Sequence, residues 1–223
     1  PAAMDVVPDA LLREEHIQVL LRTPRGGFRM QPRRRGTPGE GDTVYLTTAD
    51  AEGMMVSFIQ SNYYDFGSGI VVPGTGIALH SRAACFSLDG THPNAVAGGK
   101  RPFHTLSPAF VTARGRPVMS FGVMGGHMQP QGHVQLFVRS CLSGQNPQAA
   151  CDAPRWHVAP DGSVLLEAGV SEEVMAGLYA LGYRVQSTDY GDPLFGGAQA
   201  IRALSRGYCA SSDPRKDGQA VAL

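Results

Sequence analysis

The run Gly41-Asp42-Thr43-Val44-Tyr45-Leu46 marks a change from loop-like to strand-like sequence in this 223-residue chain. Before it, residues 23–42 are rich in glycine and proline, which is typical of a linker or an exposed loop. After it come β-branched and aromatic residues, which favour a strand. A turn and a second run of the same kind follow, so residues 43–60 are predicted to form a β-hairpin.

The rest of the chain predicts a layered arrangement of helices and largely antiparallel sheets, of the α+β class. Apolar residues at near-helical spacing predict helices over 8–21, 129–142 and 171–181. In the last of these, Ser171 is the expected N-cap and Glu172 suits the positive N-terminus. Further strands are expected at 109–112, 117–121, 183–187, 198–203 and 207–211.

Composition and charge exclude several classes of function. Lys+Arg and Asp+Glu both total 19, so no net charge attracts the chain to nucleic acid or to an anionic membrane. The basic cluster Arg33-Arg34-Arg35 is interpreted as a solvated loop and not as a nucleic-acid patch. No apolar stretch is long enough to span a membrane. No secretory signal is recognised, but the chain starts at Pro1 and is expected to be a fragment or a processed product.

Cysteine and histidine usage gives no metal site. The four cysteines form no C-x-x-C pair, so isolated buried thiols are expected, with a Cys141–Cys151 disulfide as the alternative. Isolated thiols favour a reducing compartment such as the cytoplasm. His127 and His133 lie six positions apart, on different faces of the expected helix, and no Cys or carboxylate joins them. Together with Gln131, they either shape a specificity pocket or simply belong to the helix entry.

Four groups of short motifs follow one another from residue 42 to the end of the chain. As a set they resemble the small, catalytic subunit of γ-glutamyltranspeptidases and of related cephalosporin acylases. The groups are Asp42-Thr43 with Asp50-x-x-Gly53 and Phe66-Gly67-Ser68-Gly69; Lys100-Arg101-Pro102 with Ser107-Pro108; Gly122-Val123-Met124-Gly125-Gly126; and Ala153-Pro154-Arg155-Trp156 with Gly196-Gly197-Ala198-Gln199 and Ser212-Asp213-Pro214-Arg215.

This resemblance implies a four-layer αββα sandwich of the N-terminal-nucleophile hydrolase type, present here only in part. Residues 1–42 then correspond to the C-terminal tail of the family's large subunit with the flexible pre-cleavage loop, and 43–223 to the small subunit. The missing segment of the same precursor is the implied partner, and a small-molecule amide is the implied substrate. No cofactor is implied.

The resemblance also implies that the precursor cuts itself between Asp42 and Thr43, which leaves Thr43 as the nucleophile. A threonine hydroxyl is a poor nucleophile at neutral pH and needs a base close by. Cleavage frees the α-amino group of Thr43, whose pKa near neutrality lets it accept the hydroxyl proton. Without the other motifs, Thr43 is simply the first residue of a strand.

Other site residues are carried over position by position. Gly125 and Gly126 match the pair whose backbone N–H groups form the oxyanion hole. Ser61 matches a hydroxyl that contacts the nucleophile, and Asn62 or Tyr63 falls at or beside an Asn that binds substrate. The alternatives are a tight turn for the two glycines and polar residues in a hairpin exit loop for 61–63.

Two departures from the family pattern bear on the substrate. Cys85, within Ala83-Ala84-Cys85-Phe86-Ser87, stands where γ-glutamyl enzymes carry an acidic pair that binds the glutamyl ammonium. His104-Thr105 replaces a Ser-Ser pair that holds the α-carboxylate. Since an ammonium without its counter-charge is costly to bury, glutaryl-like acyl groups are expected to fit better. The alternatives are γ-glutamyl transfer or glutathione hydrolysis, a secondary-metabolite hydrolase, and an inactive or unprocessed fragment that binds a partner.

Overall fold

The structure, a computed structural model, describes residues 13–15, 18 and 43–222. Most of the helix expected over 8–21, the arginine cluster at 33–35 and the residue Asp42 lie outside these ranges. The continuous part of the described chain begins at Thr43.

The first hairpin forms as predicted. Strand β1 (Thr43–Ala49) pairs antiparallel with β2 (Met55–Ser61), with Thr43 opposite Ser61. Side chains alternate between the two faces of this ribbon, as the pleat requires. Tyr45 and Met55 are buried on one face, and the opposite face exposes the apolar side chains of Val44, Leu46, Val56 and Phe58.

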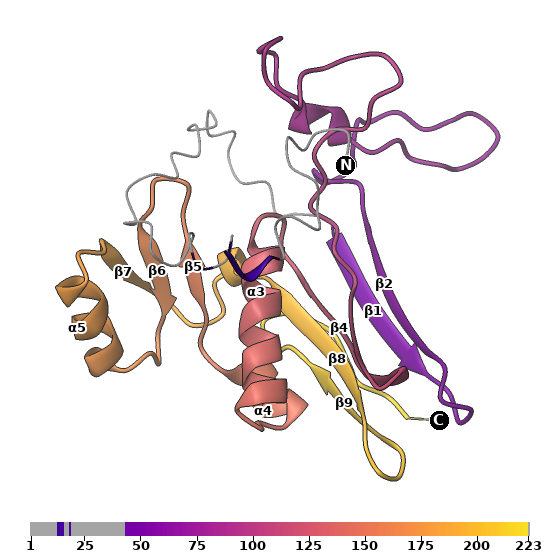
Figure 1. Cartoon of the computed structure of the whole chain (residues 1–223). Helices are drawn as coiled ribbons and strands as arrows, with labels where there is room; N and C mark the ends of the chain where they lie inside the picture. The colour runs from indigo at the N-terminus through magenta and orange to yellow at the C-terminus, as the bar shows by residue number, and fades with distance from the viewer. Residues whose placement is uncertain (1–12, 16–17, 19–42, 223) are drawn as a thin grey trace.

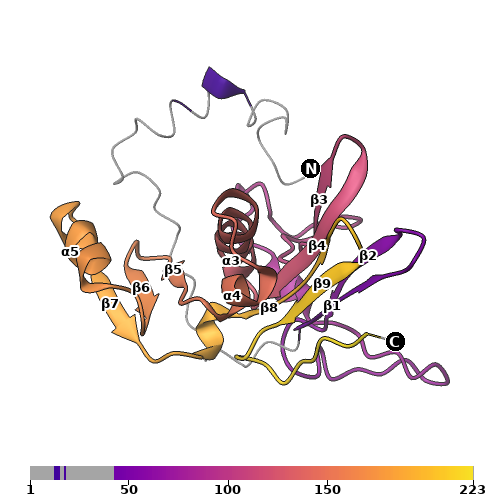
Figure 2. The ribbon, with the colours of Figure 1, turned by 90° about the horizontal axis from the view of Figure 1, so that it is seen from below.

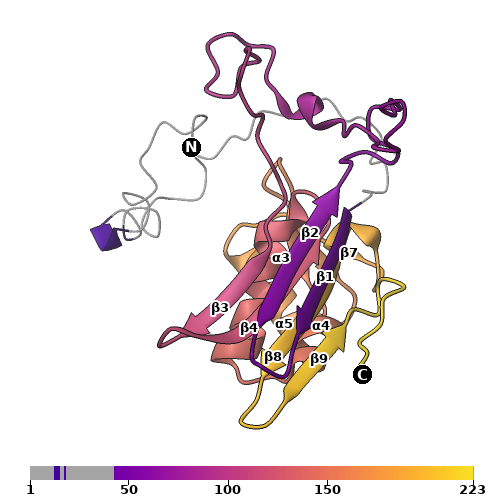
Figure 3. The ribbon, with the colours of Figure 1, turned by 90° about the vertical axis from the view of Figure 1, so that its right-hand side faces the viewer.

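A four-stranded antiparallel sheet lies behind the hairpin (Figure 3). Its spatial order is β3 (Ala109–Ala113), β4 (Arg116–Met124), β8 (Gly197–Ala203) and β9 (Tyr208–Ser212). One face packs against β1 and β2. The other is covered by α3 (Met128–Phe137), which continues as a π-helical turn, η2 (Val138–Leu142), and by α4 (Pro147–Asp152). The predicted 109–121 hairpin and the strands near 198–203 and 207–211 are confirmed.

The main core lies between the four-stranded sheet and its helices. Its buried members are Met119, Phe121, Val123, Leu136, Ala150, Cys151, Ala198 and Ala200. A Cβ at Gly132 of α3 would lie 2.6 Å from Val123 Cγ1, so only glycine lets the helix approach the sheet this closely. The described chain thus forms a layer from the β1–β2 hairpin, a layer from the four-stranded sheet and a layer from the helices α3 and α4. The layered α+β class is confirmed.

A smaller unit lies to one side of these layers (Figures 1 and 2). It contains β5 (Trp156–Val158), β6 (Val164–Glu167), β7 (Val185–Thr188) and α5 (Glu172–Ala180). The cap is as predicted, because the Ser171 hydroxyl accepts a hydrogen bond from the Val174 N–H. The β6–β7 pair is parallel, and all other strand pairs described are antiparallel.

The long connection 62–108 rises from the end of the layers where β1 begins and β2 ends (Figures 1 and 3). Its one helical turn is η1 (Arg82–Cys85), and a second 3-10 turn, η3 (Pro193–Phe195), precedes β8. Among the helices of the described residues, none is long and apolar enough to cross a membrane.

His133, on α3, belongs to the core rather than to a pocket. Its ring meets the Phe121 ring edge-on at 5.5 Å between centroids, and its Nε2 is buried without a hydrogen-bond partner in the described chain. Burial lowers the pKa of His133 to about 4. The histidine is therefore neutral in the native protein at neutral pH.

Replacing His133 with leucine is expected to flatten the pH dependence of stability in mild acid. The unfolded chain binds a proton on His133 near pH 6.5, and the native chain binds it only near pH 4. Native stability therefore falls as pH drops through this window, by up to about 3 kcal/mol. Urea unfolding at pH 7.5 and 4.5 measures the effect. Val134→Leu, at an exposed position of the same helix, is the control and should keep the wild-type slope.

Candidate active site

Thr43 and Ser61 face each other where the hairpin opens. Thr43 is 6% exposed, and its Oγ1 donates a hydrogen bond to Ser61 Oγ at 2.9 Å. The same Ser61 oxygen accepts a hydrogen bond from the Tyr63 N–H at 2.9 Å. The Thr43 hydroxyl is thus held in one orientation at the buried face of β1.

Contacts between the two packed sheets place this pair relative to the glycine pair at 125–126. The hydroxyls of Thr47 and Ser120 hydrogen-bond across the layers. Two residues closer to the start of β1, the Tyr45 ring lies on Gly122, where a Cβ would come within 2.4 Å of it. From these two contacts, and a further step of two residues along each strand, we infer that Thr43 lies near the level of Met124, immediately before Gly125.

Gly125 and Gly126 form the turn that leads from β4 into α3. Their φ angles of +134° and +57° favour glycine, because other residues rarely adopt them. Their carbonyls accept hydrogen bonds from the N–H groups of Met128 and Gln129. Within the described chain, no hydrogen bond uses the N–H groups of the two glycines themselves. The turn therefore has two backbone donors that no acceptor among the described residues uses.

Gly196 supports this turn from behind. A Cβ on Gly125 would lie 2.9 Å from Gly196 Cα, and a Cβ on Gly196 would lie 2.1 Å from the Met124 carbonyl oxygen. Gly196 also has a φ of +69°. The two backbone segments therefore touch directly, and a displacement of Gly196 would move the turn at Gly125.

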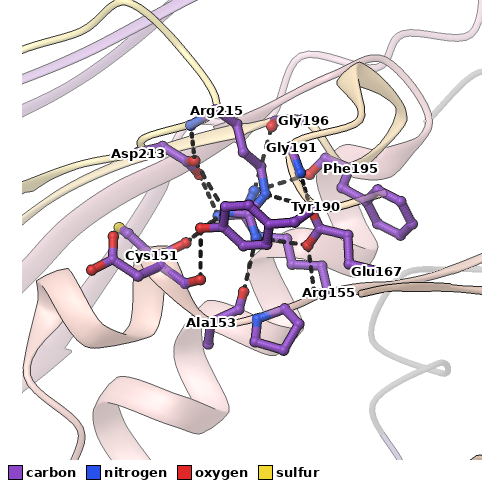
Figure 4. A network of polar contacts seen from close by, with 12 residues as sticks. Cys151, Ala153, Arg155, Glu167, Tyr190, Gly191, Phe195, Gly196, Asp213 and Arg215 are labelled. Carbon is purple, nitrogen blue, oxygen red and sulfur yellow. Dashed lines mark hydrogen bonds and ion pairs between the residues drawn. The ribbon is translucent and has the colours of Figure 1, made fainter. Parts of the chain in front are cut away.

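A buried cluster of four charged side chains fixes the position of Gly196 (Figure 4). Arg155 pairs with Asp213, and Arg215 pairs with both Asp213 and Glu167. Arg155 Nη1 also donates to the carbonyl of Phe195 at 2.9 Å. All four side chains are almost completely buried, at 0–2% relative exposure. Three of the sequence motifs, around residues 155, 196 and 213, therefore meet in one place.

Oppositely charged side chains in this cluster stabilise one another. Burial acts to raise the pKa of Glu167, but hydrogen bonds from Arg215 and from the N–H groups of Gly191 and Arg155 outweigh it, so the pKa is lowered overall. Burial likewise opposes the charge on Arg215, but the two carboxylates raise its pKa above the ordinary value. The Arg215 guanidinium also stacks on the Tyr190 ring, 4.6 Å from its centroid.

The five residues expected to bind substrate lie on the 62–108 connection. The Asn62 carbonyl accepts hydrogen bonds from the N–H and hydroxyl of Ser81. Burial raises the pKa of Tyr63, with the Cys85 thiol as a further cause, and Arg82, in the same turn η1 as Cys85, lies over the Tyr63 ring. Cys85 and Thr105 are buried, and His104 is exposed. Of the expected substrate-binding residues, Tyr63, Cys85 and Thr105 thus belong to one partly buried group, and the His104 side chain is exposed to solvent beside it.

Two residues that the sequence did not single out join this group. Arg82 is buried at 2% exposure and donates from Nη1 to Thr105 Oγ1 at 2.7 Å. Asn94 bridges the two segments: its Nδ2 donates to the Cys85 carbonyl, and its Oδ1 accepts from the Phe103 N–H. A lone arginine and a lone asparagine in irregular sequence carry no periodic signal that could have identified them.

The polar residues after the glycine pair have other roles. His127 stacks on the Phe103 ring at 5.8 Å, and Gln131 hydrogen-bonds both backbone groups of Val158. In the described residues, no group of three or more His, Cys, Asp and Glu side chains could hold a metal ion. The four cysteines are free; Cys85 and Cys151 are buried as expected, but Cys141 and Cys209 are only partly buried.

Several known proteins are similar to this chain in sequence and in fold. A family model described as gamma-glutamyltranspeptidase matches residues 10–223. The oxamate amidohydrolase proenzyme of Klebsiella pneumoniae is 38% identical over 234 residues, covering 99% of this chain and 43% of that protein. A glutathione hydrolase-like proenzyme of Bacillus subtilis is 35% identical over 229 residues, with 100% and 43% covered. The chain thus spans less than half the length of these two relatives.

Solved structures agree with the sequence matches. A cephalosporin acylase from Bacillus halodurans superposes with a TM-score of 0.84 at 44% identity, over 100% of this chain and 41% of that one. A gamma-glutamyltranspeptidase from Pseudomonas nitroreducens superposes with a TM-score of 0.69 at 27% identity, over 80% of this chain and 98% of that one.

Proposed function

The chain belongs to the γ-glutamyltranspeptidase family, and we propose that Thr43 is the nucleophile with which it hydrolyses small amides after cleavage of the Asp42–Thr43 bond. The observation that carries the proposal is the placement of Thr43. Its buried hydroxyl is held by Ser61, and the contacts of Thr47 with Ser120 and of Tyr45 with Gly122 lead along β1 towards the end of β4, where the turn at Gly125 and Gly126 begins. Nucleophile and oxyanion donors are thus supplied by two packed sheets.

The acylation step uses three groups of this site. Thr43 Oγ1 attacks the carbonyl carbon of the amide, and its proton passes to the free α-amine of Thr43. The negative charge that develops on the carbonyl oxygen is stabilised by the N–H groups of Gly125 and Gly126. The C–N bond then breaks, and the leaving nitrogen takes the proton from the α-ammonium. Water repeats the sequence on the ester and regenerates Thr43.

Cleavage before Thr43 is an essential part of this mechanism. An internal Thr43 carries an amide nitrogen, which is not basic, so the uncut chain lacks the base that the hydroxyl needs. We therefore propose that residues 1–42 are the tail of a large subunit and 43–223 the small catalytic subunit. Two relatives are named proenzymes and are more than twice as long as this chain, which supports a missing precursor segment.

The substrate proposal rests on Cys85. This buried thiol stands where γ-glutamyl enzymes are expected to carry a carboxylate, so an acyl group with an α-ammonium would lack its counter-charge here. Oxamate, the substrate in one relative's name, has a carboxylate next to its amide and no ammonium. We therefore propose carboxylate-bearing acyl groups, of the glutaryl or oxalyl kind, as the preferred donors.

A pair of chromogenic anilides tests this preference. The processed enzyme, including the rest of its precursor, is expected to hydrolyse glutaryl p-nitroanilide with a kcat/KM at least about 100-fold above that for γ-glutamyl p-nitroanilide. The size follows from the cost of burying an ammonium without a partner. Comparable or faster γ-glutamyl turnover would contradict the argument from Cys85.

A further inference from the structure

Arg82 is a buried cation for which the described residues supply no anionic partner. Its Nη1 is bonded to Thr105, but its Nε and Nη2 are buried and have no hydrogen-bond partner in the described chain. None of the ion pairs found among the described residues includes Arg82. Buried guanidinium groups are normally paired and hydrogen-bonded, because leaving them unpaired is costly. Two donors of Arg82 therefore have no acceptor among the described residues.

Short contacts connect this guanidinium to the nucleophile. Arg82 Cζ lies 4.4 Å from the centroid of the Tyr63 ring. The Tyr63 N–H donates to Ser61 Oγ, which in turn accepts from Thr43. Tyr63 thus stands between the cation and the hydroxyl, in a backbone conformation with φ of +80° that is uncommon for a residue other than glycine.

The surrounding structure holds Arg82 in place. Asn94 joins the Cys85 carbonyl to the Phe103 N–H at 2.7 and 3.0 Å, which fixes η1 against the segment that carries Thr105. Gln129, completely buried on α3, accepts from the Ser107 N–H and ties the same segment to the helix after the glycine turn. The cation therefore has a fixed position relative to Gly125 and Gly126.

The neighbours of Arg82 leave its charge unbalanced. Burial, followed by the charge of Arg82 itself, lowers the pKa of His104, so this histidine is neutral at neutral pH. Cys85, at the other end of the same turn η1, has a thiol where γ-glutamyl enzymes are expected to carry a carboxylate. A ligand that brings one negative charge and two acceptor oxygens would complete the site.

We propose that Arg82, together with the Thr105 hydroxyl, binds the carboxylate of the substrate's acyl group. The inference rests on the proposed role of Thr43 and adds the residue that selects the substrate. The planar guanidinium donates from Nε and Nη2 to the two carboxylate oxygens, a geometry that lysine cannot reproduce. The same positive charge repels an α-ammonium, so this chain carries its own basis for rejecting γ-glutamyl groups.

The experiment compares two acyl groups of equal length, using the processed enzyme with its full precursor complement. Glutaryl p-nitroanilide carries the carboxylate, and valeryl p-nitroanilide carries a methyl group in its place. Arg82→Gln is expected to lower kcat/KM for the glutaryl substrate by about 100-fold, mainly through KM, and to change valeryl turnover by less than about threefold. Arg82→Lys should fall between the wild type and Arg82→Gln. Arg116→Gln, at an exposed position of β4, should match the wild type.

Binding of glutarate, measured by calorimetry, gives a readout that does not depend on turnover. The wild type and Arg116→Gln should bind it, and Arg82→Gln should bind at least about 30-fold more weakly. An equal loss on both anilides, or unchanged glutarate affinity, would overturn the proposal. The valeryl substrate separates the proposal for Arg82 from the proposal for Thr43. Valeryl turnover that persists in Thr43→Ala would contradict Thr43 as the nucleophile, independently of the result for Arg82.

Discussion

Thr43→Ala is expected to abolish both cleavage of the precursor and amide hydrolysis. The substitution removes the only atom that the mechanism uses as nucleophile, and it leaves the bond between residues 42 and 43 intact. Loss of a covalent nucleophile typically lowers kcat by at least about 10³-fold. Turnover of glutaryl p-nitroanilide and gel analysis of the purified protein measure the two effects.

Matched variants separate this role from a structural one. Thr48→Ala makes the same change in the same strand at an exposed position and should keep wild-type cleavage and turnover. Thr43→Ser keeps a hydroxyl and should retain partial activity. Ser61→Ala removes one hydrogen bond to the Thr43 hydroxyl and should cost about 10-fold in kcat. A Thr43→Ala enzyme that still turns over the anilide would contradict the proposed nucleophile.

Asp213→Asn is expected to destabilise the native chain by about 3–5 kcal/mol. The change preserves shape but leaves the buried guanidinium of Arg155 without its carboxylate partner, and an unpaired buried charge carries a cost of this size. Urea unfolding followed by circular dichroism measures it. Because Arg155 also holds the Phe195 carbonyl beside Gly196, kcat should fall even where the variant is fully folded.

The exposed pair of Arg184 and Asp161 provides the control for this prediction. Its side chains are 69% and 60% exposed, and solvent screens their attraction. Arg184→Gln should therefore change the free energy of unfolding by less than about 1 kcal/mol. If Asp213→Asn and Arg184→Gln have similar effects, the buried cluster does not stabilise the fold in the way described.

Local signals were sufficient for much of the fold. Alternating β-branched residues placed the hairpin at 43–60, and the Ser171 cap placed α5, because both depend on neighbours in sequence. Strands β5 and β6 were missed, since strands of three and four residues show too little periodicity. Helix α4 was missed too, although the N-cap Asn146 followed by Pro147 is a recognisable start signal.

For the candidate site, too, local motifs could be read from the sequence and long-range contacts could not. The family motifs supplied Thr43, Ser61 and the two glycines, whose roles remain predictions. The pairing of Arg155 with Asp213 joins residues 58 positions apart and appears only once the chain is folded. Arg82 was missed because its burial, the feature that makes it unusual, cannot be read from a single arginine in an irregular segment. Long-range packing, rather than local propensity, creates this part of the site.

The mass and N-terminal sequence of the protein purified from its full precursor test the central claim most directly. We expect a fragment that begins Thr-Val-Tyr-Leu, at residue 43, and a Thr43→Ala precursor that stays uncut. An intact bond between residues 42 and 43 in an enzyme that hydrolyses its substrate would contradict the account, because Thr43 would then lack the free amine that activates its hydroxyl.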